Sequence, residues 1–268
     1  VDLGGRYYED DKSQLFLFDN VVLSDKTASF DNTSFRGALS YAVADSANIY
    51  FSVSQGFRSG GMNFTSPTPY EPEKILSYEV GAKATLLDNK LSVEVALYHS
   101  DYTDYQALSL DQQLRNITSN PGEAEIQGIE WSTLWTLSDY FSLGFNGNYT
   151  ESEYTKINPS STIVRVGDSL SFIPKYNYSL SANFDFQWSS AAQGFANIDY
   201  SRQGEQSFVN RGLGLLTDVS ESEDIGFLNA QIGAQFDSIT LKLFGRNLGN
   251  ELSNTRPTTA NENETLQS

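Results

Sequence analysis

The side chains able to do redox, nucleophilic or metal chemistry are few in this sequence. It has a single histidine, His99, and no cysteine among 268 residues. The lack of cysteine excludes disulfides, thiolate metal sites and cysteine nucleophiles. One histidine excludes a multi-histidine metal site and makes any Ser-His-Asp triad depend on His99. We therefore predict that the protein is not an enzyme, although paired carboxylates such as Glu123 and Glu125 leave a hydrolase open.

A second group of side chains suits ligand binding. Tyr102 and Tyr105 offer apolar area with a polar tip, in what we expect to be an exposed loop. An interfacial aromatic girdle explains these two tyrosines equally well. Arg58 could contact an anionic ligand, and a structural contact to a loop acid is its alternative. His99 could ligate iron or haem, and an ordinary interfacial position is its alternative. The predicted ligand-binding residues are Arg58, His99, Tyr102, Tyr105, Gln106, Arg115 and Asn116.

The charge balance excludes some classes of partner. The chain has 17 basic and 34 acidic residues, a formal net charge of -17. Nucleic-acid binding needs clustered Lys and Arg, so we predict none. An acidic loop with Asp218, Glu221, Glu223 and Asp224 could attract calcium, but its spacing matches no EF-hand and solvation is the default. We predict no metal site and no cofactor.

The elements that must position these residues are β-strands. Apolar and polar residues alternate with a period of two; for example, Tyr176–Trp188 places aromatic and aliphatic residues on one face and Asn, Ser, Asp and Gln on the other. We count about eleven such strands and no convincing helical period. Several runs reach about ten to thirteen residues, the length of a tilted membrane strand rather than of an average soluble one. No apolar run is long enough for a transmembrane helix.

The connections alternate in length. Short turns fall at residues 45–46, 88–89, 138–139, 189–193 and 237–238, and long polar loops are predicted at 9–33, 58–75, 102–123, 151–170 and 203–224. A meander with short turns at one end and long loops at the other is typical of an outer-membrane barrel, with periplasmic turns and extracellular loops. A Greek-key sandwich would not sort its loops in this way. The pattern therefore predicts an all-β, antiparallel up-and-down transmembrane β-barrel, with a polar face that includes Glu79, Lys83 and Glu94.

Several short motifs carry a family resemblance. They are Gly56-Phe57-Arg58-Ser59-Gly60-Gly61-Met62-Asn63, Tyr70-Glu71-Pro72-Glu73, Tyr78-Glu79-Val80-Gly81-Ala82-Lys83, Gly128-Ile129-Glu130 and Gly245-Arg246-Asn247-Leu248. In this order they resemble the C-terminal barrel of TonB-dependent outer-membrane receptors. The resemblance implies a barrel of about 22 strands around a plug. It also implies active import of ferric siderophores, haem, vitamins or oligosaccharides, energised by the periplasmic protein TonB.

Two parts of that family's pattern are missing from the sequence. We find no plug and no final strand with a terminal aromatic residue, so we expect residues 1–268 to be a partial transmembrane β-barrel without a plug domain. Half a barrel leaves two unpaired strand edges that lipid cannot satisfy. We therefore expect further strands, from a longer protein or from another chain. The expected partners are TonB through the missing plug, a small ligand such as a ferric siderophore, and outer-membrane lipid.

Two other functions remain open at this stage. One is a passive porin-like or adhesin-type outer-membrane barrel, which would lack an upstream plug. The other is a soluble secreted β protein that binds carbohydrate, which would need no detergent.

Overall fold

The computed structural model describes residues 1–19, 21–64, 66, 69–110, 115–159, 161, 163–189, 192–209 and 219–252. These residues form one antiparallel sheet of eleven strands and two small two-stranded sheets. Neighbours in the large sheet follow the chain, with β4, β5, β12 and β13 set aside: β1-β2-β3-β6-β7-β8-β9-β10-β11-β14-β15. The prediction of an all-β, up-and-down meander of about eleven strands is confirmed. None of the described residues forms a helix long and apolar enough to cross a membrane.

The strands of the large sheet are β1 (Asp2–Phe18), β2 (Val21–Ala44), β3 (Ala47–Arg58), β6 (Glu73–Leu86), β7 (Leu91–Leu110), β8 (Asn116–Ser138), β9 (Phe141–Ile157), β10 (Tyr176–Ser189), β11 (Ala192–Gln203), β14 (Ile225–Phe236) and β15 (Ile239–Gly245). The small sheets pair β4 (Gly61–Met62) with β5 (Pro69–Tyr70), and β12 (Ser207–Val209) with β13 (Val219–Glu221). The edges of the large sheet are β1 and β15.

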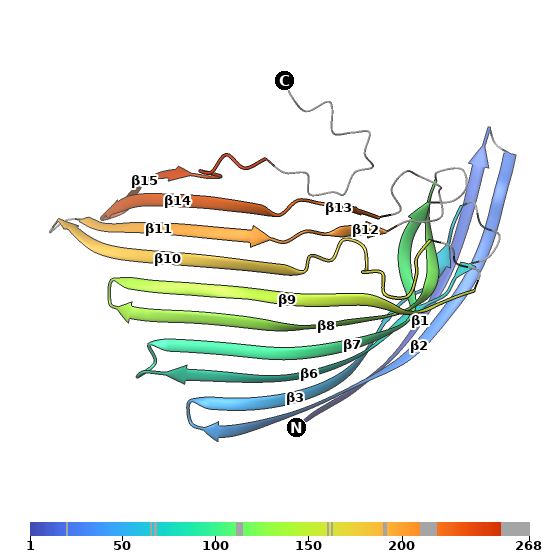
Figure 1. The fold of residues 1–268 in the computed structure, drawn as a ribbon, viewed down its shortest axis with the longest axis horizontal. Helices are drawn as coiled ribbons and strands as arrows, with labels where there is room; N and C mark the ends of the chain where they lie inside the picture. Colours follow the sequence, from blue (N-terminus) through green and yellow to red (C-terminus); the bar gives the residue numbers. More distant parts are fainter. Residues whose placement is uncertain are drawn as a thin grey trace.

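The two ends of the sheet differ, as Figure 1 shows. Tight turns join the strands at one end, on the left of the view, and the longer connections with the small sheets gather at the other. We call these the short-turn end and the long-loop end. The turn between β6 and β7 is tight because Leu87, Asp88 and Asn89 adopt left-handed backbone angles, with φ of 55°, 55° and 67°.

Three of the predicted long loops are wrong in extent. β1 and β2 pair through most of residues 9–33, β7 and β8 pair through much of 102–123, and β9 continues to Ile157. The prediction ended each strand where the apolar alternation ended. Backbone N–H and C=O groups pair whatever the side chains are, so a hairpin continues beyond its apolar part.

The two faces of the sheet are inverted relative to a soluble protein. We call the face that bears Leu97 the outer face and the face that bears Glu94 the inner face. One row of directly paired outer-face residues is Leu39, Phe51, Val80, Leu97 and Ile129. The first four expose 47–55% of their surface. Such a continuous exposed apolar surface is far larger than a soluble protein leaves uncovered.

The inner face is polar and hydrogen-bonded across strands. Lys83 Nζ lies 2.8 Å from Glu94 Oε2, so these two residues form a cross-strand ion pair. Other rungs join Ser132 to Asn146, Asn197 to Asn183 and Gln231 to Asn197, at 2.6–2.8 Å. A cavity of about 700 Å³ hollows this face, lined by Lys83, Glu94, Glu130 and Asn146 among others.

A buried apolar cluster lies at the long-loop end. Ala124 and Tyr154, directly paired between β8 and β9, are each 2% exposed. Val164 and Leu170 of the following connection pack on them. Backbone hydrogen bonds from Tyr154 N to Asp168 O and from Gly167 N to Tyr154 O hold that connection against β9. The chain therefore has its firmest packing at the end where the predicted binding residues lie.

Candidate functional site

The centre of the candidate site is a cluster of Arg58, Glu73 and Gln106 at the long-loop end. Arg58 ends β3 and is paired in register with Glu73, the first residue of β6. Arg58 Nη2 lies 2.6 Å from Glu73 Oε2 and donates to the carbonyl of Gln106 at 2.8 Å. The Gln106 backbone N–H donates to the same Glu73 oxygen at 2.6 Å. The nearly buried Glu73 carboxylate is therefore matched by two donors, one of them charged.

The Arg58 guanidinium is only partly used by these contacts. Its side chain is 54% exposed, whereas that of Glu73 is 11% exposed. Both of its hydrogen bonds use Nη2, and we find no other hydrogen bond of this guanidinium among the described residues. The remaining N–H groups of the guanidinium are charged donors of the kind that bind anions.

Three tyrosines extend this cluster. The Tyr102 and Tyr105 rings lie 5.5 Å apart, and the Tyr105 and Tyr154 rings 5.8 Å apart, both edge to face. Burial, and secondly the negative charge of Glu73, raises the pKa of Tyr105 to about 12. Burial likewise raises the pKa of Tyr154. All three hydroxyls thus stay neutral donors at physiological pH.

A β-bulge places Tyr105 on the inner face. Tyr102 pairs with Ala124 and Tyr105 with Gly122, so three steps on β7 match two on β8. Asp104 takes up the extra residue in a left-handed conformation, with φ of 52°. Without the bulge, strict alternation would turn Tyr105 to the outer face. We name the six residues Arg58, Glu73, Tyr102, Tyr105, Gln106 and Tyr154 the mouth cluster.

Asparagine and lysine side chains brace the loop beside the mouth cluster. Asn63 and Thr118 exchange two hydrogen bonds, and Asn120 donates to the carbonyls of Glu71 and Asp104. Lys12 Nζ donates to the carbonyl of Gly60 at 2.6 Å. Gly60 must be a glycine here, because a Cβ would lie 2.4 Å from the Phe30 ring and 2.6 Å from the Tyr70 carbonyl. The glycine-containing segment that follows β3 is therefore closely packed against its neighbours.

The predicted binding residues divide into three groups. Arg58, Tyr102, Tyr105 and Gln106 come together in the mouth cluster. Arg115 and Asn116 lie further along the β7–β8 hairpin, where Asn116 pairs with Leu110, and they do not join the cluster. His99 belongs to neither group, because its alternation with Tyr98 places it on the outer face with Leu97.

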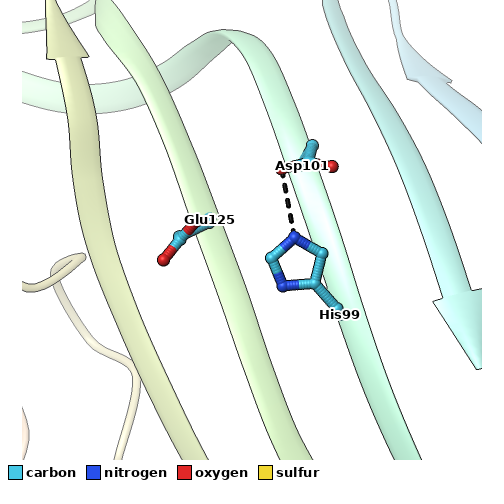
Figure 2. Close-up of side chains that lie close together, drawn as sticks. All are labelled: His99, Asp101 and Glu125. Carbon is cyan, nitrogen blue, oxygen red and sulfur yellow. Dashed lines mark hydrogen bonds and ion pairs between the residues drawn. The ribbon is translucent and has the colours of Figure 1, made fainter.

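His99 lies in a small polar cluster of its own. His99 Nε2 is 3.2 Å from Asp101 Oδ1, and Glu125 lies beside them on the neighbouring strand, as Figure 2 shows. One ligand atom from each of the three side chains lies within 4.8 Å of the others. The Asp101 and His99 side chains are 56% and 40% exposed. We name His99, Asp101 and Glu125 the outer-face cluster.

Part of the predicted acidic loop lies within the described residues. Asp218 lies outside the described residues. Asp224 forms an ion pair with Arg202, at 3.0 Å, and accepts a hydrogen bond from the Tyr176 hydroxyl. These donors, Tyr176 first, hold the pKa of Asp224 below its ordinary value. Asp224 is thus engaged as an ion-pair acceptor.

Sequence reasoning missed two members of the mouth cluster, Glu73 and Tyr154. Glu73 stands in the Tyr70–Glu73 motif, but a motif does not show that the carboxylate is buried. Tyr154 was assigned to a polar loop. Tyr154 shares the inner face with Asn148, Thr150 and Ser152. This two-residue spacing continues β9 and could have predicted the position of Tyr154.

Comparisons with known proteins agree with this architecture. Residues 1–248 match the family model described as TonB dependent receptor-like, beta-barrel. The metal-pseudopaline receptor CntO of Pseudomonas aeruginosa is 26% identical over 171 residues, which are 62% of this chain and 23% of that protein. The ferrichrome outer membrane transporter/phage receptor of Escherichia coli K12 is 27% identical over 186 residues, 69% of this chain and 24% of that protein. The chain thus spans about a quarter of these relatives' length.

Solved structures show the same fold. The ferric yersiniabactin uptake receptor FyuA from Yersinia pestis superposes with a TM-score of 0.75 at 20% identity, covering 95% of this chain and 39% of that one. The siderophore receptor PiuA from Acinetobacter baumannii gives a TM-score of 0.70 at 18% identity, covering 96% and 38%. At such identities the likeness concerns the arrangement of strands.

Proposed function

The chain belongs to the TonB-dependent receptor β-barrel family, and from that premise we propose that it forms part of the wall and the extracellular mouth of an energised importer. The family is one of outer-membrane proteins, and the bacterial outer membrane is the location of this chain. The family consists of transporters and receptors rather than enzymes, and our proposal contains no chemical step.

The inverted faces of the sheet support a role as barrel wall. The exposed apolar outer face suits lipid, and the polar inner face with its cross-strand rungs suits water or a polar plug. The open edges at β1 and β15 support a partial barrel of residues 1–268, because unpaired edges are not tolerated in lipid. In this orientation the short-turn end is periplasmic and the long-loop end extracellular.

The mouth cluster is the observation that carries the proposed ligand class. It combines a half-exposed, always-charged guanidinium with three tyrosines that stay protonated. The guanidinium attracts an anionic ligand, and the partly exposed rings of Tyr102 and Tyr105 pack against its flat or apolar parts, while the buried Tyr154 supports them. The relatives named above receive metal chelates and siderophores. We therefore propose a metal–siderophore chelate with net negative charge as the ligand of the intact protein.

The proposed mechanism has three stages. The chelate is captured at the mouth, TonB then moves the plug at the expense of the membrane's proton gradient, and the chelate passes along the polar inner face. Arg58 supplies attraction and orientation, while the buried Glu73 and Gln106 keep its guanidinium in place. A passive barrel is the alternative, and it would need neither TonB nor a proton gradient.

Uptake of radiolabelled iron tests this proposal. The intact protein is produced in a bacterium that lacks receptors for the chelates used, ferrichrome and a catecholate siderophore. We expect saturable uptake of the negatively charged ferric catecholate, abolished by a protonophore or by deletion of TonB. Uptake of the uncharged ferrichrome alone would refute the proposed charge of the ligand. Uptake of both that is unsaturable and indifferent to the protonophore would establish the passive barrel instead.

Variants connect uptake to the mouth cluster. Arg58→Gln and Tyr102→Ala are expected to weaken chelate binding by at least about tenfold each, the effect of losing roughly 1.4 kcal/mol. Tyr149→Ala is the matched control, because Tyr149 lies on the outer face and is 43% exposed. Equal binding by all three variants and the wild type would remove the mouth cluster from ligand recognition, even if TonB-dependent import persists.

A further inference from the structure

The outer-face cluster has a geometry that the proposed import does not use. Asp101 of β7 and Glu125 of β8 are directly paired in register. His99 precedes Asp101 by two residues, so its side chain leaves β7 on the same face. Two hydrogen-bonded strands therefore hold one imidazole and two carboxylates side by side, as Figure 2 shows.

From this arrangement we propose that His99, Asp101 and Glu125 form a binding site for one divalent transition-metal ion on the outer face. Metal–nitrogen and metal–oxygen bonds of about 2.0–2.2 Å place neighbouring ligand atoms roughly 3–4 Å apart. Ligand atoms of the three side chains already lie within 4.8 Å of one another, and His99 Nε2 and Asp101 Oδ1 are at 3.2 Å. Coordination of one ion by all three side chains requires the Glu125 carboxylate to rotate toward His99 and Asp101.

The charges around the cluster support a bound cation. Glu153 of β9 pairs with Glu125, so Asp101, Glu125 and Glu153 stand in one row across three strands. Directly opposed like charges destabilise a sheet. Among the described residues, neither Glu125 nor Glu153 has an ion pair. Lys175, which lines the same cavity of about 290 Å³ as these two glutamates, is paired with Glu205 at 2.5 Å. A divalent ion would neutralise most of the repulsion in the row.

The donor set indicates the class of metal. One imidazole and two carboxylates suit borderline ions such as Zn²⁺. Calcium prefers six to eight oxygen ligands, which this cluster does not supply. Three protein ligands leave at least one coordination position open, for water or for an external anion.

The position of the cluster separates it from the transport path. His99 follows Leu97, a member of the exposed apolar row, by two residues on the same face. The open coordination position therefore faces the surroundings of the wall just beyond the apolar band, whereas the mouth cluster faces inward. The ion would join β7 to β8 and offer its free position to the membrane surface.

Zinc binding to the intact protein in detergent tests the proposal, with no polyhistidine tag present. Isothermal titration with Zn²⁺ is expected to show a saturable site that His99→Gln and Glu125→Gln each weaken by at least about tenfold. Glu130→Gln is the matched control: it removes one negative charge from β8, but on the inner face, and leaves zinc affinity unchanged. With Cu²⁺ as a probe, electron paramagnetic resonance is expected to show imidazole nitrogen coupling that His99→Gln removes.

Three outcomes would overturn the site. They are no difference in zinc binding between wild type and His99→Gln, equal weakening in Glu130→Gln, and copper spectra unchanged by loss of His99. Circular dichroism of each variant establishes that it is folded. His99→Cys, which replaces the imidazole by a thiolate ligand, is expected to restore zinc binding and so separates loss of a ligand from loss of structure.

Discussion

Tyr102 and His99 lie three residues apart on β7, yet the two clusters they belong to differ in burial and in the pairing of their charges. The mouth cluster is mostly buried, and its one buried carboxylate, Glu73, is matched by a guanidinium and a backbone N–H. The outer-face cluster is partly exposed and sets two carboxylates directly opposite each other. The strand β7 thus contributes to one cluster whose buried carboxylate is fully paired and to another in which two carboxylates face each other. The difference is produced by side-chain alternation and by a single bulge at Asp104.

The two faces differ most along the exposed apolar row that contains Leu97, and the largest effect on stability is expected there. Leu97→Arg places a charge on the lipid-facing row and is expected to destabilise the intact protein by about 2–4 kcal/mol. Ala96→Arg, one residue earlier, points to the inner face between Gly81 and Glu130 and is expected to cost far less. Denaturant unfolding in lipid vesicles measures both. Equal costs would show that the outer face does not contact lipid.

Within the mouth cluster, Glu73→Gln tests whether the buried carboxylate organises the site. The substitution weakens two charge-assisted hydrogen bonds of 2.6 Å, with an expected loss of about 2–3 kcal/mol in unfolding free energy. Glu94→Gln is the control. It removes an ion pair with Lys83 whose partners are each about half exposed, so its cost is expected below about 1 kcal/mol. Chelate binding should fall with Glu73→Gln and not with Glu94→Gln.

Buried and exposed tyrosines are expected to affect the unfolding free energy differently at alkaline pH. Burial and Glu73 raise the pKa of Tyr105 from an ordinary value near 10 to about 12. Because the neutral form is favoured in the folded state, this stabilisation is complete below pH 10 and is lost as the pH rises to about 12. After allowance for partial exposure it is worth roughly 2 kcal/mol. Tyr105→Phe should flatten the decline in unfolding free energy between pH 10 and 12, and Tyr140→Phe, a substitution at an exposed turn residue, should not.

Much of the fold could be predicted from the sequence, because a two-residue period encodes both strand and face. The face of His99 and the wall polarity at Lys83 follow from alternation, and the order of strands follows from the lengths of the connections between them. The binding residues were predictable only in part. The bulge at Asp104 shifts Tyr105 to the inner face, and no composition rule locates a one-residue insertion. Glu73 became recognisable only when the register placed it opposite Arg58 and beneath Gln106. Tyr154 was not predicted, because β9 continues beyond its apolar part with mostly polar residues, and such a stretch resembles a loop in sequence.

The smallest expected effect concerns the outer-face cluster without metal. Glu125→Gln removes one of three carboxylates in a row, so it should raise the unfolding free energy by a few tenths to about 1 kcal/mol at low salt. The gain should disappear near 1 M salt, where charge interactions are screened within about 3 Å. At saturating Zn²⁺ the wild type is expected to have the higher unfolding free energy. Zinc binding stabilises the wild type, whereas Glu125→Gln has lost one zinc ligand. A gain that persists in both high salt and zinc would mean that neither charge repulsion in the row nor a bound ion depends on Glu125. The contrast with the mouth cluster would then not lie in unpaired charge.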